Sequence, residues 1–392
     1  MRATTSSAGV ARHGRLTRPR PVLSILKLLG VGVVVLAVSA TSVAAIDTSL
    51  TLANARTFDL PGAPATPPDI GAMEGGFNIL IVGSDRGETE QELKERGGAE
   101  LNDVTMILHV SGDHTRAVAV SIPRDMVVPI PSCPKKDGSG NHPSMAGQPI
   151  NVTLSYGGMP CTVLTVQELT GLQIDFAGLI TFNGVIEMSN AVGGVPVCLA
   201  EDIYDDSSGF QGGAGIHVLQ GNTALQFLRS RKHVGDGSDL TRISSQQVFL
   251  SSLVRTLKSE DTLNDPAKLY TIAQAAVSNM ELSSNFRNTD TLISIARALS
   301  TLELDQVTFV QYPGSTNNPG IYFNKVKPNA EVASQLFAKI LADEPFGLTG
   351  IGDDSGSVLD PSATAPPVDP NLEVIAGLTG QTAAAETCSV GR

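Results

Sequence analysis

The chain has 392 residues, of which 41% are hydrophobic, so it can form a substantial core. It contains no tryptophan and only 4% aromatic residues, which excludes a carbohydrate groove lined with stacked tryptophans. The net charge is −12, and six of the 27 basic residues lie before residue 28, where no acidic residue occurs. The rest of the chain is therefore strongly acidic, and this excludes general nucleic-acid binding.

Residues 28–46 form an uncharged apolar run directly after that basic segment. As a helix with a rise of ~1.5 Å per residue the run would span roughly 28 Å, about the hydrocarbon thickness of a bilayer. We predict a single-pass transmembrane anchor, with residues 1–27 in the cytoplasm and the rest outside the cell membrane. The alternative is a cleaved signal peptide, because "VAA" at 43–45 resembles a cleavage site. Residues 47–76 are rich in Pro, Ala, Gly and Thr and are expected to form a flexible spacer.

Apolar runs, caps and glycine stops then predict strands that alternate with helices up to residue 342. Strands are expected at 77–84, 103–111, 115–123, 176–182, 195–199 and 306–313. Helices are expected at 163–171, 183–194 with an asparagine cap, 221–232, 239–259, 266–279, 289–302 and 328–342, and a long loop at 131–149. This order indicates a sheet that helices cover on both faces.

Residues 343–392 are rich in Gly, Pro, Ser, Thr and Ala, which is typical of a weakly structured, low-complexity tail. The four cysteines include no CxxC pair, so a zinc site is not indicated. An even number of cysteines outside the cytoplasm suggests two disulfides, for which three pairings are possible. We favour the pairing that would also tie the tail to the core, which is Cys133–Cys161 with Cys198–Cys388.

Acidic and basic side chains cluster at predicted strand ends and at one junction between helices. Asp85 and Asp103 lie at strand termini, Arg124 follows the third strand, and "LRSRKHVGDGSDLTRISSQQ" at 228–247 adds further arginines. A guanidinium fork binds two phosphate oxygens, and carboxylates bind Mg²⁺ through oxygen. A pyrophosphate with Mg²⁺ is therefore the simplest ligand that uses both sets.

Spacing adds detail to this hypothesis. Arg242 and Gln246 are four residues apart and share a helix face, and Asp239 lies one turn before Arg242, where it can orient the guanidinium. Arg229 and Arg231 would diverge on a regular helix, so we expect the helix to end near Arg229 and the chain to bend there. Each of these motifs alone is weak evidence for a binding site. Their joint presence in this order along the chain is strong evidence.

Taken together, the motifs resemble the LytR-CpsA-Psr family, also called the cell envelope-related transcriptional attenuator domain. The resemblance spans about residues 77–259 and depends on "FNILIVGSDRG", "LNDVTMILHVS", "AVAVSIPRDM", "INVTLSYGG", "LTGLQIDFAGLITFNGVIEMSNAVGGVPV" and the arginine-rich segment above. It implies a catalytic domain over 77–342 that folds as an α/β/α sandwich with a mixed central sheet and has an apolar pocket for a polyprenyl chain. It also implies Mg²⁺-dependent transfer of a glycopolymer from a polyprenyl-pyrophosphate carrier to a peptidoglycan hydroxyl, as a phosphodiester, with release of polyprenyl phosphate.

The resemblance also implies roles for individual residues. Asp85 and Asp103 would be the metal ligands, and Asp85 would also accept the proton of the acceptor hydroxyl. Asp125 and Asp239 would orient the arginines. The predicted catalytic residues are Asp85, Arg124, Arg229 and Arg231, and the predicted pyrophosphate-binding residues are Arg86, Arg124, Arg229, Arg231, Arg242 and Gln246.

Two other functions use the same sequence features. A polyprenyl-pyrophosphate hydrolase would need the same residues, with water in place of the acceptor. A non-catalytic regulatory or lipid-binding protein of the envelope is the third hypothesis. The expected partners are the lipid-linked glycan donor, a wall acceptor and the membrane. The sequence does not identify the glycopolymer.

Overall fold

The computed structural model describes residues 56–62, 76–85, 100–263, 265–287, 289–350, 356–364 and 369–392. The predicted anchor at 28–46 and Arg86 both lie outside these ranges. Within them, no helix combines the length and the apolar character that crossing a membrane requires.

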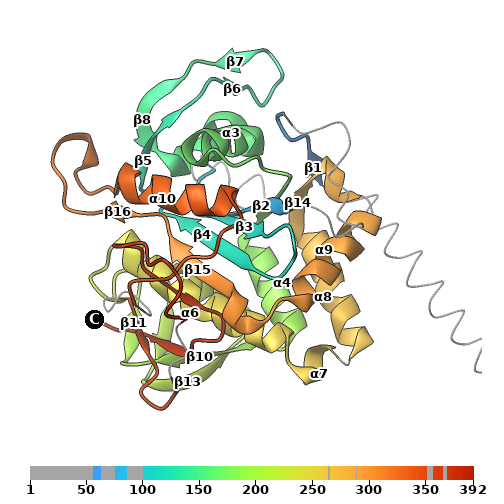
Figure 1. Cartoon of the computed structure of the whole chain (residues 1–392), viewed down its shortest axis with the longest axis vertical. Helices are drawn as coiled ribbons and strands as arrows, with labels where there is room; N and C mark the ends of the chain where they lie inside the picture. The colour runs from blue at the N-terminus through green and yellow to red at the C-terminus, as the bar shows by residue number, and fades with distance from the viewer. Residues whose placement is uncertain are drawn as a thin grey trace, which may run out of the picture. The chain divides into compact units, whose positions relative to one another are not determined.

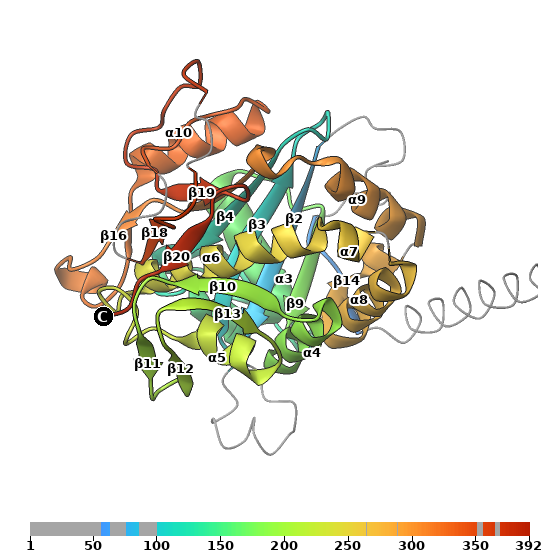
Figure 2. The ribbon, with the colours of Figure 1, turned by 90° about the horizontal axis from the view of Figure 1, so that it is seen from below.

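The main sheet has eight strands in the order β1-β14-β9-β2-β3-β4-β15-β19. Figure 1 labels β2, β3, β4 and β15 of this sheet, and Figure 2 labels β9 and β19. Parallel pairs (β1 with β14, β2 with β9, β4 with β15) are combined with antiparallel ones, so the sheet is mixed, as predicted. In sheet order the bounds are Thr57–Phe58, Met280–Ser283, Phe176–Ile180, Phe77–Ser84, Asn102–Val110, Ala117–Ile122, Val307–Gln311 and Gly380–Thr382.

Helices pack on both faces of this sheet, and each face has its own apolar core. On one face the core includes residues of α3 (Thr153–Thr170) and α10 (Ala330–Leu341). On the other face it includes residues of α9 (Thr289–Thr301) and α6 (Asp239–Leu257). The remaining α-helices of the described residues are α4 (Phe182–Val192), α5 (Asn222–Arg229), α7 (Glu260–Leu263) and α8 (Pro266–Asn279).

A second sheet covers the outer side of α6 (Figure 2). Its strand order is β13-β10-β20-β18, with bounds Gly215–Leu219, Val195–Leu199, Thr387–Ser389 and Ser357–Leu359. Leu250 and Val254 of α6 pack toward the main sheet, whereas Val248 and Phe249 join the core under the second sheet. Because it lies between two sheets, α6 has twelve buried residues, including Asp239 and Arg242 at its first turns.

Four two-stranded antiparallel sheets complete the described fold. They pair β5 with β8, β6 with β7, β11 with β12, and β16 with β17. Their bounds, in the same order, are Val127–Ile130 and Met145–Pro149, Cys133–Pro134 and Asn141–His142, Ile203–Asp205 and Phe210–Gly212, and Gly314–Ser315 and Lys327–Pro328.

Three local predictions were wrong. The 131–149 segment is not a plain loop, because it forms β6, β7 and β8. The helix expected at 163–171 begins at Thr153, with a non-helical break at Gly157 and Gly158. The cap of α4 is Thr181 and not Asn183, because the Thr181 hydroxyl accepts a hydrogen bond from Gly184 N.

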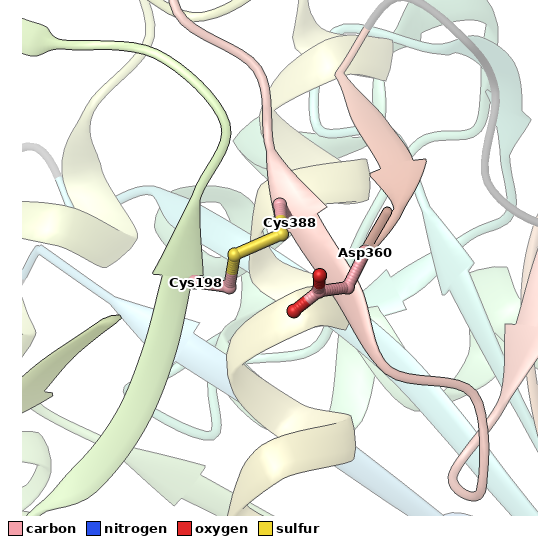
Figure 3. Close-up of side chains that lie close together, drawn as sticks. All are labelled: Cys198, Asp360 and Cys388. Atoms are coloured by element: carbon pink, nitrogen blue, oxygen red, sulfur yellow. A yellow bond between two sulfur atoms is a disulfide. The ribbon is translucent and has the colours of Figure 1, made fainter. Parts of the chain in front are cut away.

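The segment with tail-like composition supplies β18, β19 and β20, so its described parts are ordered strands of the two sheets. Both favoured disulfides are present. Cys198 lies opposite Cys388 in the parallel β10–β20 pair, and their disulfide joins strands that lie 190 residues apart in the sequence (Figure 3). The prediction that this bridge ties the C-terminal segment to the core is confirmed.

Candidate functional site

The two predicted metal ligands lie at one edge of the main sheet, where β2 ends and β3 begins. The pairing shifts register here: Gly83 faces Val104, but Ser84 faces Asn102, so Asp103 is the extra residue of a β-bulge. A bulge turns a side chain away from the regular alternation and is common beside active sites. Asp85 is held next to this bulge, because its Oδ1 accepts a hydrogen bond from Leu101 N at 3.1 Å.

Arg124 reaches the same edge from the loop after β4. Its Nη1 donates to Asp103 Oδ1, and its Nε lies 3.8 Å from Asp239 Oδ1. Burial works against the charged guanidinium, but the Asp103 and Asp239 carboxylates outweigh it and raise the pKa of Arg124. The side chain is 25% exposed, so solvent or a ligand can still reach it.

The first turns of α6 complete this group. Ser238 caps the helix, and Arg242 Nη2 lies 2.6 Å from Asp239 Oδ1 and donates to the Asp103 carbonyl oxygen at 2.8 Å. Burial lowers the pKa of Arg242, although Asp239 opposes this effect. With its side chain only 6% exposed, Arg242 is placed to hold the bulge and Asp239 in position.

Several polar atoms of this group are buried in the described structure without a well-formed hydrogen bond. They are Arg124 Nε, Arg242 Nε and both carboxylate oxygens of Asp239, although Asp239 Oδ1 still has its ionic contacts with Arg242 and Arg124. Buried polar atoms are normally satisfied, and exceptions concentrate where a ligand, an ion or water completes the site. The unsatisfied atoms therefore mark this ion cluster as the strongest candidate site in the described residues.

A second group of charges adjoins the first at Asp125. Arg231 Nη2 lies 3.3 Å from Asp125 Oδ2, and Lys325 Nζ lies 3.4 Å from Asp125 Oδ1. Sequence reasoning missed Lys325, since no pattern in "IYFNKVKP" distinguishes it from a surface lysine. It is brought to the site because Val326 N donates to the Asp125 carbonyl oxygen at 3.1 Å.

The backbone around Arg231 is fixed by Asp205, which sequence reasoning also missed. Asp205 Oδ2 accepts hydrogen bonds from Arg231 N at 2.8 Å and Lys232 N at 3.1 Å. Arg231 Nε donates to the Gly237 carbonyl oxygen at 3.2 Å. The only sequence signal at Asp205 is a turn-like "DDSSG", which predicts a local turn and not a contact with residues 26 positions away.

The Asp205 interactions predict a specific loss of stability in acid. Burial opposes ionisation, but hydrogen bonds from Ser207, Arg231 and Lys232 prevail and lower the pKa of Asp205 from 3.8 to about 2. A lowered pKa gives stability that is complete above the unfolded value and is lost as pH falls through the folded value, here between about pH 4 and 2. Wild type should lose about 2 kcal/mol over this range relative to Asp205→Asn, measured by urea unfolding at pH 7, 4 and 2. If wild type and Asp205→Asn lost the same stability in acid, the Asp205 carboxylate would not be the cause of the loss.

Two predicted ligands are not brought into contact with the cluster. α5 ends at Arg229 and the chain bends at Ser230, as expected, but the Arg229 guanidinium stacks 4.6 Å from the centre of the Phe182 ring. Gln246 Nε2 donates to the Leu228 carbonyl oxygen at 3.0 Å, which joins α6 to the end of α5. Their predicted roles in pyrophosphate binding remain predictions.

Cations and carboxylates are balanced at this sheet edge. Four cations (Arg124, Arg231, Arg242 and Lys325) form ion pairs with three carboxylates (Asp103, Asp125 and Asp239), and Asp85 lies beside them. The guanidinium groups of the arginines suit phosphate oxygens. The Asp85 and Asp103 carboxylates fit a hard cation in their donor chemistry, and both lie at the same sheet edge.

Two other places in the described residues bring polar or metal-ligating side chains together. A cavity of about 600 Å³ opens at the opposite edge of the main sheet, beside His109, Arg116 and Lys339. Its basic side chains already have partners: His109 and Arg116 contact Asp343, and Lys339 contacts Glu344 and Glu373. Asp360 lies beside Cys198 and Cys388, but these sulfurs are bonded to each other and are not thiolate ligands (Figure 3).

Comparisons with known proteins show what this chain is similar to. A sequence profile of the LytR_cpsA_psr family matches residues 36–338. The chain is 31% identical over 270 residues to the cell wall biosynthesis protein LcpA of Corynebacterium glutamicum, covering 62% of this chain but only 51% of that protein. It is 26% identical to the polyisoprenyl-teichoic acid–peptidoglycan teichoic acid transferase TagT of Bacillus subtilis, over 64% of this chain and 72% of TagT. The crystal structure of TagV from B. subtilis superposes with a TM-score of 0.53 at 25% identity, covering 69% of this chain and 99% of TagV.

Proposed function

Because this chain belongs to the LytR-CpsA-Psr family, we propose that it transfers a glycopolymer from a polyprenyl-pyrophosphate carrier to a cell-wall acceptor. The observation that carries the proposal is the buried ion cluster of Arg124, Arg242, Asp103 and Asp239, which retains unsatisfied polar atoms. Arg231 and Lys325 add cations at its margin. TagT, which this chain resembles, is a transferase that attaches teichoic acid to peptidoglycan, and this reaction belongs to the same class.

The lipid part of the donor needs an apolar surface that starts near the pyrophosphate. Ile81, Val104 and Leu108 meet this requirement: they lie on the two central strands, pack against the core on the α6 side, and are still partly exposed. Central strands under a layer of helices normally bury such residues. Val104 directly follows Asp103, so the surface begins at the carboxylate edge of the sheet. We infer that the polyprenyl chain lies along these side chains.

The reaction follows from these positions. The acceptor hydroxyl oxygen attacks the phosphorus that carries the glycan, a phosphodiester bond forms, and the bridging bond to the lipid phosphate breaks. The hydroxyl proton passes to a carboxylate, for which Asp85 at the sheet edge is our assignment. Arg124 and Arg231 stabilise the charge that develops on the departing polyprenyl phosphate. Arg242 and Asp239 keep Arg124 and the Asp103 bulge in place.

Asp85 and Asp103 would hold a Mg²⁺ ion in this proposal. When bound, the ion would neutralise negative charge on the phosphate oxygens. The hard oxygen donors of the two carboxylates and their common sheet edge support this assignment. We further propose that residues 28–46 anchor the enzyme in the cell membrane, with the catalytic domain on the outside, where both donor and wall acceptor are present.

The proposal is tested with the folded chain, a labelled polyprenyl-pyrophosphate-linked glycan and peptidoglycan fragments as acceptor. We expect a phosphodiester-linked product that requires the acceptor and Mg²⁺, and its loss on addition of EDTA. Release of polyprenyl phosphate at equal rates with and without acceptor, and no linked product, would instead identify a hydrolase. Donor binding with neither product would identify a lipid-binding protein.

A further inference from the structure

Residues 389–392 lie against the loop that carries Arg231. The chain leaves β20 at Ser389, and Gly235 N donates to the Val390 carbonyl oxygen at 3.1 Å. Val234 and Gly391 form an antiparallel bridge. Arg392 Nη1 lies 3.3 Å from the position that a Cβ on Gly237 would occupy. Residues 389–392, which we call the clasp, therefore contact the middle and the end of the 231–237 loop.

Hydrogen bonds within the 231–237 loop connect the residues that the clasp contacts to Arg231. Val234 N donates to the Arg231 carbonyl oxygen at 3.2 Å, and Gly237 N donates to the Val234 carbonyl oxygen at 2.9 Å. The Gly237 carbonyl oxygen in turn accepts from Arg231 Nε at 3.2 Å. Val234, held by the clasp, thus connects both ends of the loop that orients the Arg231 side chain.

The clasp has its own anchors, which do not depend on the loop. Cys388, just before it, is bonded to Cys198, and Ser389 Oγ lies 2.5 Å from Ser245 Oγ of α6. Val390 N donates to the Gly356 carbonyl oxygen at 3.1 Å. The clasp is therefore fixed to β10, β18 and α6, and α6 is the helix that carries Asp239 and Arg242.

We propose that the clasp is a positioning element for Arg231, which keeps this guanidinium beside Asp125 and ready to bind the donor pyrophosphate. The inference rests on the proposed function for its catalytic consequence. Arg231 N is still held by Asp205 when the clasp is displaced. Loss of the clasp is therefore expected to misplace the guanidinium without releasing the loop altogether.

Gly391→Ala is the variant that tests this. A Cβ on Gly391 would lie 2.5 Å from the Asp202 carbonyl oxygen and 3.2 Å from Glu201 Cβ, so the clasp must shift away from its place. Gly350→Ala is the matched control, because a Cβ on Gly350 meets nothing within 4 Å. Both variants keep Arg231, both cysteine pairs and the carboxylates of the ion cluster.

Three measurements are made on the full chain. Hydrogen exchange of peptides covering 231–238 should be faster in Gly391→Ala than in wild type and unchanged in Gly350→Ala. Affinity for inorganic pyrophosphate, measured by calorimetry, should fall by about 10-fold, as should transfer at low donor concentration, because a small misplacement of a binding group has effects of this order. Combining Gly391→Ala with Arg231→Ala should give no further loss beyond Arg231→Ala alone.

The inference is overturned if exchange in 231–238 is unchanged, if pyrophosphate affinity is unchanged, or if the two substitutions have additive effects. A wild-type chain that catalyses no transfer would count against the proposed function only. In that case exchange and pyrophosphate affinity still decide whether the clasp positions Arg231.

Discussion

Replacing Arg124 with alanine is expected to lower acceptor-dependent transfer by about 10²–10³-fold, the usual effect of removing one group that stabilises developing charge. Arg124 contacts Asp103 and approaches Asp239, and it remains partly exposed to the site. Its loss removes a ligand for the pyrophosphate and leaves the Asp103 carboxylate without its cation. The measurement is the steady-state rate of phosphodiester formation at saturating Mg²⁺.

Two further variants make this result interpretable. Arg124→Lys keeps the charge but not the planar fork, so it should recover only part of the rate. Arg116→Ala removes an arginine from the opposite edge of the sheet, where Arg116 donates to the Asp343 carbonyl oxygen, and it should leave transfer unchanged. Full activity of folded Arg124→Ala would exclude Arg124 from the reaction.

Filling the partly exposed apolar surface on the α6 side with Ile81→Trp should weaken binding of long-chain donors. If the tryptophan displaces the equivalent of two or three methylene groups of the prenyl chain from the surface, the binding free energy falls by about 2 kcal/mol. This loss corresponds to about a 30-fold rise in KM. A donor with a short prenyl chain need not reach Ile81, so its KM should not change. The measurement is KM for donors of graded chain length, which separates lipid contacts from chemistry at the phosphates.

Ile216→Trp is the matched control, because Ile216 is 72% exposed on β13 of the second sheet. It introduces the same bulk at a position away from the proposed lipid surface and should affect neither donor. A chain-length-independent effect of Ile81→Trp would argue against a polyprenyl chain at this place. Thermal unfolding of both variants distinguishes a blocked surface from a damaged core.

Much of the fold could be predicted from local patterns. The apolar run of β2 has the predicted bounds Phe77–Ser84, and α8 has the predicted bounds Pro266–Asn279. Such elements are determined by periodicity, caps and proline positions within the segment itself. The family motifs also placed Asp103, Arg124, Asp239 and Arg242 in one site, and the structure brings these four together.

Other features depended on contacts between distant segments. The composition of residues 343–392 favours a loose tail, because it offers few apolar residues in regular alternation. Its short strands form because neighbouring strands supply hydrogen-bond partners: β19 pairs with β15, and β20 lies between β10 and β18. Lys325 and Asp205 could not be predicted for the same reason, because neither lies in a sequence motif. Lys325 is brought to the site by a hydrogen bond between the neighbouring backbone and that of Asp125, and Asp205 by hydrogen bonds from the backbone around Arg231 to its carboxylate.

The sequence by itself determined the alternation of strands and helices, the family, and the residue types that suit a pyrophosphate. The tertiary structure decided which of those residues meet: the bulge that turns Asp103 toward Arg124, and the two sheets that bury α6. It also separated Arg242, held inside the protein, from Arg229, stacked on Phe182. Residue type limits what a side chain can bind, whereas burial and orientation are set by neighbours that are distant in sequence.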